Sequence, residues 1–568
     1  MIFDIESGYR FFFKIKFDKI NKGIVMITKR LNVGRCVCVA LVFALFFALN
    51  GYAGDENVPT EKAIKCAGTV STSDSITNHS DSNTVGSLAK VIKQIGAGFG
   101  TIELQGPKTY VLKNDLTIPK KVIIKFQSGA VLFVEKDCTL KFDGVIDAGL
   151  QQIFDGPGHI KGKPKVSAVV PQWFGAEGDG IADDTVSLQK AVDFACTSQI
   201  LAVDLNIGWY RITKTLDCTN IRQPSMPRDG LNIYGSSFLN TQIIGDTGDN
   251  TAVMDISGVE WLQLNNFMIT SSKNDVTGGV RGNNPSTVGI FVGCGKVLPQ
   301  SSQQRCHVFI GMQDDMKANG GKGTIGLWNF ASEENTYDSV TIIANRPVVL
   351  TALNSSSCDW EYKNSYVEQM SVHSIGMTTF SGETCLIAMG APAFTTVCAY
   401  SLSIQNGYIQ MRNAKNVPVF DVSGSLMNLT FSGTVEGGGR LFRINNGGKW
   451  IDGSQMRGEM FGSNISCVFG VLADKNEPII ELASGGKIIN SDIKINCSGE
   501  PGLENRNLFA VIEDKDAKYT GGIFNTTIKT NQPSKWIQVP EIIKKNCKQT
   551  TISNNESYTD LAFPPLAK

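Results

Sequence analysis

Short runs of apolar residues, each ended by a glycine or a polar residue, recur along the chain from residue 101 onward. Before residue 150 these runs are Thr101–Leu104, Tyr110–Leu112, Leu116–Ile118, Val122–Phe126, Val131–Val134, Leu140–Phe142 and Val145–Ile146. Apolar runs of this length, separated by Gly, Asn, Ser and Asp, are typical of β-strands joined by turns. The pattern therefore predicts an all-β chain.

The strand pattern continues after residue 230 and repeats at irregular intervals. Leu231-x-Ile233 recurs 31 positions later as Leu262-x-Leu264, and Leu402-x-Ile404 recurs 27 positions later as Leu429-x-Phe431. Irregular repeats of about 20–35 residues made of short strands favour a solenoid, in which each coil stacks on its neighbours. A β-sandwich rarely continues for about 400 residues without a domain break, and a propeller has a firmer period with an aromatic signature in each blade.

One segment departs from the strand pattern: PQWFGAEGDGIADDTVSLQKAVDFA, residues 171–195. Gly178-Asp179-Gly180 predicts a chain reversal, and the carboxylate of Asp183 or Asp184 can accept a free N–H at the start of a helix. The residues that follow at helical spacing and form one apolar stripe are Leu188, Ala191, Val192 and Ala195. Such a helix covers the strand edges that the first coil of a solenoid leaves open.

This segment resembles the signature of the pectate-lyase superfamily domain, also called rhamnogalacturonase/epimerase-like, which is written W-x-G-A-x-G-D-G-x-x-D-D-T-x-x-x-Q-x-A. The residues that match are Trp173, Gly175, Ala176, Gly178, Asp179, Gly180, Asp183, Asp184, Thr185, Gln189 and Ala191. The resemblance covers about 20 residues, and it implies a single-stranded right-handed parallel β-helix with a short N-terminal capping helix. Right-handed crossovers are the rule for parallel strands. Such folds occur in secreted bacterial polysaccharide-active proteins and in phage tailspikes, whose trimers raise the question of an oligomer here.

The acidic turn of this segment is interpreted as structural. It lacks the D-x-[DN]-x-[DN]-G order of a calcium loop, and no Gly-Lys-Ser/Thr follows as in a phosphate loop. A catalytic acid cluster is the alternative, but a turn and a helix start account for all of its residues.

The N-terminal region is interpreted as a targeting signal. Lys29, Arg30 and Arg35 precede the apolar run Val37–Leu49, and Gly51-Tyr52-Ala53 supplies small residues for cleavage. The run is shorter than the roughly 20 apolar residues of a membrane span. Residues 1–53 are therefore predicted to be a leader and secretory signal peptide, with an uncleaved anchor as the alternative and Met26 as a second candidate start. Secretion to the periplasm or the exterior follows.

The remaining boundaries follow from composition. Residues 54–88 are predicted to be a linker, residues 89–169 an N-terminal region of short strands, residues 170–530 the parallel β-helix, and residues 531–568 a C-terminal cap or tail.

Charge and cysteine content exclude some functions. The 568-residue chain has 53 basic and 53 acidic residues, so it offers no basic field for nucleic acid. Of its 14 cysteines, Cys36 and Cys38 lie in the predicted signal peptide, and the even remainder permits disulfides in an oxidising compartment. Because no CxxC pair occurs, zinc or thioredoxin-like chemistry is not expected, and most cysteines are predicted to pack as free thiols. No metal ligands are assigned.

Carboxylates lie beside aromatic residues in one stretch, around residues 310–370. Rings stack on sugars while acids bind hydroxyls or move protons. The predicted proton-transfer residues are Asp338, Glu334, Asp359 and Glu361, and the predicted substrate-binding residues are Tyr337, Trp360, Tyr362 and Arg346. The plainer interpretation makes all of them solvated turn residues. The N-T-D, D-D, G-H-G and R-I-K series of β-helix polygalacturonases is absent in that order.

Two function classes follow. The first is an exported lyase or glycoside hydrolase acting on an acidic, uronate-containing polysaccharide, with calcium as a cofactor if it is a lyase. The second is a non-catalytic β-helix that binds glycans or serves as a cell-surface adhesive or structural protein. A fold of this kind hosts both.

Overall fold

The computed structural model describes residues 70–71, 86–219, 227–271, 286–293, 305–312, 323–330, 335–351, 378–397, 399–413, 417–445, 457–470, 478–483, 485–498, 508–512, 521–530 and 547–554. The predicted leader, the signal peptide and most of the predicted linker lie outside these residues. All strand pairs in the described part of the chain are parallel, as the ladders of the first and last strands illustrate.

Residues 100–161 form three short coils, each with three strands. The first coil contains β2 (Gly100–Leu104), β3 (Lys108–Leu112) and β4 (Leu116–Ile118); the second contains β5 (Val122–Phe126), β6 (Ala130–Val134) and β7 (Thr139–Phe142); the third contains β8 (Val145–Asp147), β9 (Phe154–Asp155) and β10 (His159–Lys161). Buried and partly buried residues alternate along β2 and β6, because every second side chain of a strand points inward. The predicted strands before residue 150 all fall in these coils.

Two elements precede the first coil. β1 (Val70–Ser71) pairs with β2. The helix α3 (Gly86–Ile95) buries Leu88, Val91 and Ile92 in the same core as the strands. Their i, i+3, i+4 spacing gives the helix one apolar face.

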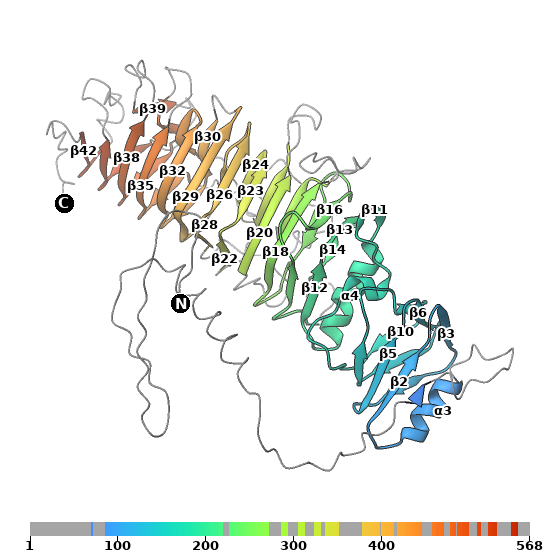
Figure 1. Ribbon diagram of the computed structural model, residues 1–568. Helices are drawn as coiled ribbons and strands as arrows, with labels where there is room; N and C mark the ends of the chain where they lie inside the picture. Colours follow the sequence, from blue (N-terminus) through green and yellow to red (C-terminus); the bar gives the residue numbers. More distant parts are fainter. Residues whose placement is uncertain are drawn as a thin grey trace, which may run out of the picture. The chain divides into compact units, whose positions relative to one another are not determined.

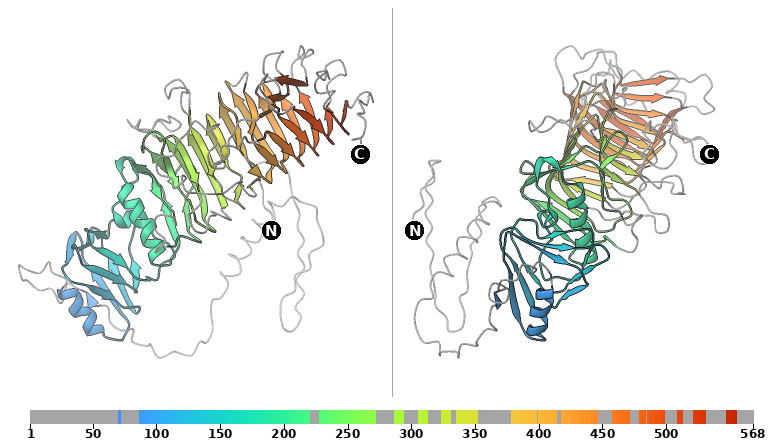
Figure 2. Two further views of the ribbon diagram at one scale, coloured as in Figure 1. Left: turned by 180° about the vertical axis from the view of Figure 1, so that it is seen from behind. Right: turned by 90° about the vertical axis from the view of Figure 1, so that its right-hand side faces the viewer.

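The later coils build three further parallel sheets (Figures 1 and 2). The longest has seventeen described strands: β11 (Asp179–Asp183), β12 (Ala202–Asn206), β13 (Gly208–Ile212), β15 (Asn232–Gly235), β16 (Thr241–Gly245), β18 (Gln263–Ser271), β20 (Arg305–Met312), β22 (Asn335–Asp338), β23 (Thr341–Ala344), β25 (Thr378–Ser381), β26 (Cys385–Met389), β29 (Leu402–Arg412), β32 (Thr430–Gly437), β35 (Asn464–Gly470), β38 (Asp492–Ser498), β41 (Thr527–Thr530) and β42 (Thr551–Asn554). We call it the long sheet.

The second sheet has ten described strands: β14 (Leu216–Asp217), β17 (Ala252–Asp255), β19 (Val288–Val292), β21 (Ile325–Phe330), β24 (Arg346–Thr351), β27 (Phe394–Val397), β30 (Pro418–Ser423), β33 (Arg440–Asn445), β36 (Ile480–Ala483) and β39 (Phe509–Ile512). The third has five: β28 (Ala399–Tyr400), β31 (Ser425–Met427), β34 (Glu459–Phe461), β37 (Lys487–Ile489) and β40 (Gly522–Phe524). We call these the ten-stranded and five-stranded sheets.

The core consists of inward side chains that pair from coil to coil. On the long sheet Ile233 pairs with Leu264, and Ile404 pairs with Phe431. These pairs are separated by the 31 and 27 positions of the sequence repeats, so each repeat is one step between paired strands. On the ten-stranded sheet the rings of Phe394, Phe420 and Phe442 stack with centroids 5.0 and 5.1 Å apart.

A ladder of tight turns leads from the five-stranded sheet into the long sheet. Ser401, Asn428, Asn490 and Asn525 have φ between 44° and 53°, and each donates its backbone N–H to a carbonyl of the following coil at 2.8–3.0 Å. Short polar residues tolerate this left-handed conformation better than other side chains. Asn525 Nδ2 also donates to Asn490 Oδ1 at 2.9 Å, which links the side chains of neighbouring turns.

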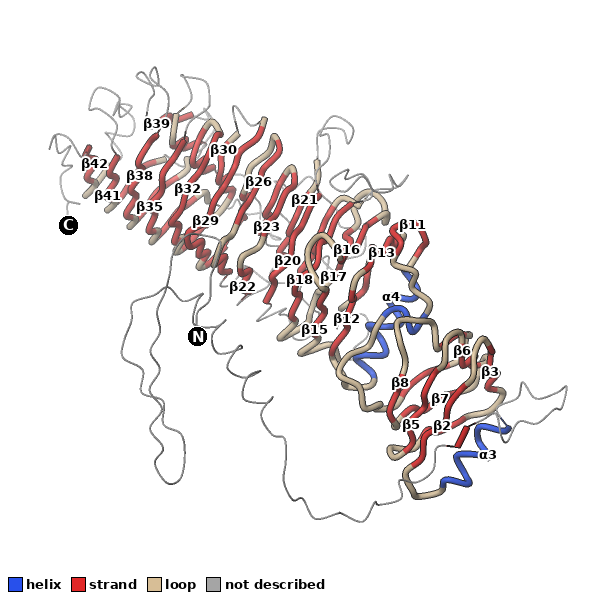
Figure 3. Tube along the Cα trace, viewed as in Figure 1, coloured by secondary structure: helices blue, strands red, loops and turns tan. Residues whose placement is uncertain are grey.

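The helix predicted after the acidic turn is α4 (Thr185–Thr197), preceded by the 3₁₀-helix η1 (Pro171–Phe174). The four residues of its predicted stripe are all fully buried. Figure 3 shows it beside the first strands of the long sheet, as predicted. Its Phe194 ring also lies 5.8 Å from Phe174 and 6.2 Å from Phe154 of the last N-terminal coil. The predicted fold class, an all-β parallel β-helix with a short capping helix, is confirmed, and the helix lies between the last N-terminal coil and the first strands of the long sheet.

No helix in the described part of the chain is both long enough and apolar enough to cross a membrane.

Candidate functional site

The predicted site residues fall into two groups. Glu334, Asp359, Trp360, Glu361 and Tyr362 lie outside the described residues, so their assignments stay predictions. Asp338, Tyr337 and Arg346 are described, and the structure places each in a different environment.

Asp338 is an exposed carboxylate at the end of β22 on the outward face of the long sheet. Ser381 Oγ, on the neighbouring strand β25, donates to Asp338 Oδ1 at 2.8 Å. His307 Nδ1, on the strand β20, lies 3.0 Å from the backbone oxygen of Asp338. The three side chains thus belong to successive coils. They do not form a Ser–His–Asp triad, because the hydroxyl contacts the carboxylate and the imidazole contacts a backbone oxygen.

Tyr337 is a correction to the predicted site. Its side chain is 1% exposed, and its ring stacks on Phe380 with centroids 5.1 Å apart. Alternation along β22 turns Tyr337 inward when Asp338 faces outward. The ring is therefore part of the core and offers no surface to a sugar.

Arg346 does not lie beside Asp338. It begins β24 of the ten-stranded sheet, whereas Asp338 belongs to the long sheet. Its Nη1 lies 3.4 Å from Thr395 Oγ1. The two residues that the sequence grouped by proximity in the chain are thus separated by the fold.

The acids of the turn before α4 are occupied by local hydrogen bonds. Asp179 Oδ1 accepts the N–H groups of Ile181 and Ala182 at 2.7 and 2.8 Å. Asp183 Oδ1 accepts the N–H of Thr185 at 3.1 Å, and its Oδ2 accepts the Thr213 hydroxyl at 2.7 Å. These contacts support the structural interpretation of the turn.

Asp184 differs from the expectation for a helix cap. It occupies the N-cap position of α4, yet its side chain makes no capping hydrogen bond. Its carboxylate instead accepts the N–H groups of Glu177 and Gly178 at 2.8 and 3.0 Å, which closes the glycine-rich turn.

The other residues of the signature have structural positions. Gly175, Gly178 and Gly180 have φ of 91°, 65° and 78°, in the range that favours glycine. Trp173 Nε1 donates to Gly149 O at 3.3 Å and so joins η1 to the N-terminal coils.

Asp184 should give the protein a specific pH dependence. Burial raises its pKa to about 6, above the usual value near 3.8. The folded state then binds more protons than the unfolded state between these pH values, so this contribution to the free energy of unfolding increases as the pH falls through 6 and is lost as the pH rises. Between pH 7 and pH 4 we expect the wild type to gain about 1–3 kcal/mol relative to D184N. Denaturant unfolding of both proteins measures this, and parallel pH profiles would contradict it.

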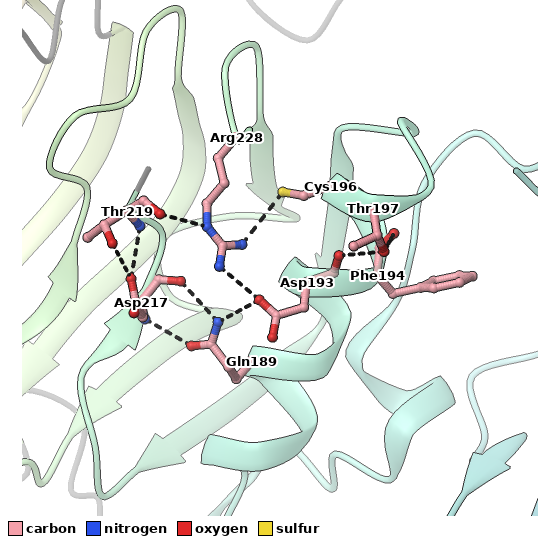
Figure 4. A network of polar contacts seen from close by, with 8 residues as sticks. All are labelled: Gln189, Asp193, Phe194, Cys196, Thr197, Asp217, Thr219 and Arg228. Carbon is pink, nitrogen blue, oxygen red and sulfur yellow. Dashed lines mark hydrogen bonds and ion pairs between the residues drawn. The ribbon is translucent and has the colours of Figure 1, made fainter. Parts of the chain in front are cut away.

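A second polar network connects α4 to Asp217 of β14, to Thr219 and to Arg228 (Figure 4). The fully buried Arg228 donates from Nη2 to Asp193 Oδ1 at 2.9 Å and from Nε to Thr219 O at 3.2 Å. Gln189 Nε2 donates to Asp193 and to Asp217 O, each at 3.0 Å. Since the guanidinium faces protein acceptors on several sides, we interpret the network as the attachment of α4 rather than as a ligand site.

The outward face of the long sheet carries a polar cluster that the sequence reasoning missed. Tyr408, Gln410 and Arg412 alternate along β29, and Glu436 lies on the adjacent strand β32. The Tyr408 hydroxyl donates to Glu436 Oε2, Gln410 Nε2 donates to the same oxygen at 3.2 Å, and Arg412 Nε donates to Gln410 Oε1 at 2.7 Å. We call these four residues the β29 cluster. The period-two alternation of residues 408–412, after the irregularity at Asn406 and Gly407, was the signal that could have indicated it.

The β29 cluster is suited to binding rather than to proton abstraction. The hydrogen bond to Glu436 and desolvation raise the pKa of Tyr408 to about 12, so the phenol stays protonated at neutral pH. Tyr408, Arg412 and Glu436 are exposed. A ring beside donors and acceptors of both charges is the combination that binds sugars.

The described cysteines and acids indicate no metal or redox site. Six of the eight described cysteines are buried. Within the described residues no group of three His, Cys, Asp or Glu side chains could hold a metal ion.

The coil stacking and the exposed cluster define a parallel β-helix protein with a polar, partly aromatic outward face. No protein-family model and no curated protein matches the chain. Among solved structures it is similar to the enzymatically active domain of tailspike protein 2 of bacteriophage CBA120, with 14% identity, a TM-score of 0.38, and coverage of 65% of this chain and 48% of that chain.

Two further similarities are of the same order. The mannuronan C-5 epimerase AlgE4 A-module of Azotobacter vinelandii has 14% identity and a TM-score of 0.38, covering 68% of this chain and 99% of that chain. PfbA, a surface adhesin of Streptococcus pneumoniae, has 10% identity and a TM-score of 0.33, covering 69% and 93%. The chain spans about half of the tailspike, at 48%. The resemblance to the pectate-lyase superfamily stays a prediction.

Proposed function

We propose that this protein is exported and binds an acidic polysaccharide along the outward face of the long sheet. The observation that carries the proposal is the β29 cluster, in which an exposed tyrosine ring is fixed beside Glu436, Gln410 and Arg412. The ring supplies a surface for sugar C–H groups, Arg412 supplies a positive charge for a uronate, and the other two side chains bind hydroxyls. The face continues from coil to coil, which suits a polymer.

The proposal predicts a specific effect of Tyr408. Truncation to alanine removes the stacking surface, which is worth about 0.5–1.5 kcal/mol for an aromatic contact. We therefore expect Y408A to weaken binding of polygalacturonate or alginate about 3- to 10-fold. Affinity electrophoresis or calorimetry on a panel of acidic and neutral polysaccharides measures this effect.

Tyr400 provides the matched control, because it is an equally exposed tyrosine, 41% against 36%, on the five-stranded sheet. Y400A should bind like the wild type. Equal affinities of the wild type and Y408A for every polymer that binds would place the glycan on another face.

A lyase or glycoside hydrolase is the second candidate function. His307 and Asp338 favour it, because two side chains able to transfer protons lie on neighbouring strands of the same outward face. Thr341 begins β23, the strand that follows Asp338 in the same coil. It pairs with Cys385 of β26, and Cys385 pairs with Tyr408 of β29, so Thr341 and Tyr408 are two strand spacings apart. Strand spacing puts Thr341 and Tyr408 about 10 Å apart, so one oligosaccharide can contact both regions. Calcium remains the expected cofactor of the lyase alternative.

A further inference from the structure

The ten-stranded sheet has a row of polar and charged side chains on its outward face, away from the β29 cluster. Thr395, Asp421, Arg443 and Glu481 are direct register partners on β27, β30, β33 and β36. Their neighbours in the same strands, such as Phe420 and Phe442, form the aromatic core, so the row points away from that core. Successive members are therefore about 4.8 Å apart along the sheet.

One end of the row is paired within the protein. Arg440 Nη1 lies 2.6 Å from Glu481 Oε2, and Arg443 Nε lies 3.7 Å from Glu481 Oε1. The Glu481 side chain is only 2% exposed. This carboxylate is held by arginines, and it is not the group that needs a ligand.

The other end is incompletely paired. Arg346 and Arg443 are both close enough to Asp421 to act on its charge. No ion pair joins either guanidinium to Asp421 within the described residues. The buried atoms Asp421 Oδ1 and Arg346 Nε also have no hydrogen-bond partner, and Arg443 Nε makes no hydrogen bond but lies 3.7 Å from Glu481 Oε1. Buried donors without acceptors are costly. Arg346, Arg440 and Arg443 together face two carboxylates, those of Asp421 and Glu481, so one positive charge is in excess.

From this arrangement we infer that Arg346, Asp421 and Arg443 form a binding site for an oxyanion, with the carboxylate of an acidic sugar as its ligand. The oxyanion accepts N–H bonds from the two guanidinium groups, which present planar donors matched to carboxylates. The Arg443 side chain is 42% exposed, so the ligand can reach the site from solvent. The sugar as the source of the anion rests on the proposed function, whereas the oxyanion site itself does not.

Asp421 has a defined part in this site. Burial raises the pKa of its carboxyl, against the opposite influence of Arg443 and Arg346. A protonated Asp421 donates a hydrogen bond to the bound anion, whereas an ionised one repels it. Anion binding should therefore favour the protonated form of Asp421. The asparagine variant, which is neutral and keeps a donor, should bind at least as well as the wild type.

The test uses the full chain and three probes: galacturonate, its uncharged methyl ester, and inorganic sulfate, each titrated by calorimetry. We expect galacturonate to bind and its methyl ester to bind at least about tenfold more weakly. R346Q and R443Q should each weaken galacturonate binding about tenfold or more, because each removes a charge-assisted hydrogen bond. D421N should retain binding.

The control is K125Q, which also removes one positive charge but lies in the N-terminal coils, where Lys125 is 48% exposed. It should bind galacturonate like the wild type. If sulfate binds as tightly as galacturonate and R443Q loses this binding, the oxyanion site is supported, with a free inorganic anion as its ligand. The inference is overturned if no probe binds, or if R346Q and R443Q bind as the wild type does even though their folding stability is reduced. Because the probes are small anions, this result does not depend on whether polymer binds the β29 cluster.

Discussion

F420A is expected to lower the free energy of unfolding by about 3–5 kcal/mol. Phe420 is fully buried, with ring centroids 5.0 Å from Phe394, 5.1 Å from Phe442 and 5.5 Å from Phe431. Removing the ring opens a cavity in the middle of the stack and removes three aromatic contacts. Rigid coils above and below limit the collapse that would otherwise fill the space.

Denaturant unfolding measures the total loss of stability, and hydrogen exchange in β27, β30 and β33 locates it. The control is F461A on β34, because the Phe461 side chain is 37% exposed. Its substitution should change stability by less than about 1 kcal/mol. A loss of that small size in F420A would mean that the ring stack contributes little to the stacking of the coils.

D338N is expected to lower turnover about 10²–10⁴-fold on any polysaccharide that the wild type cleaves. The carboxylate is exposed and fixed by Ser381, so the amide keeps the shape and the hydrogen bond but cannot take or give a proton. Unsaturated uronide products would identify a lyase, and new reducing ends without them a hydrolase. H307Q tests whether His307 is the second proton-transfer group, because in that case its replacement should lower turnover by a factor of the same order.

Asp492 supplies the matched control, because it is an exposed aspartate on the long sheet in a different coil. D492N should cleave at the wild-type rate. If D338N retains full turnover, proton transfer belongs to another residue, and Glu334, Asp359 and Glu361 are the next to replace.

The fold followed from the sequence more closely than the site did. The inward residues Ile233 and Leu264 repeat because each coil needs an apolar residue at the same place, and that need leaves a pattern in one chain. The turn and stripe of α4 were visible for a different reason, because glycines in a turn and apolar residues at helical spacing are local signals. The position of the functional surface depends on which residues become neighbours across coils, and no fixed period gives this.

Residues that contact each other across adjacent strands are not separated by a constant number of positions in the sequence. Tyr408 and Glu436 are 28 residues apart, while Asp338 and Ser381 are 43 apart, although both pairs join adjacent strands. Segments of different length between the strands cause this variation. Proximity in the chain therefore grouped Tyr337 and Arg346 with Asp338, whereas strand alternation buried the first and the coil carried the second to another sheet.

The ladder of left-handed turns fixes the register of the coils. Ser401, Asn428, Gly462, Asn490 and Asn525 mark the same point of successive coils, so each turn resets the register before the next strand of the long sheet begins. One residue added inside a strand would exchange its inward and outward side chains up to the next turn. A segment added between strands leaves the strand register unchanged, and natural variation in chain length is therefore expected to accumulate between strands.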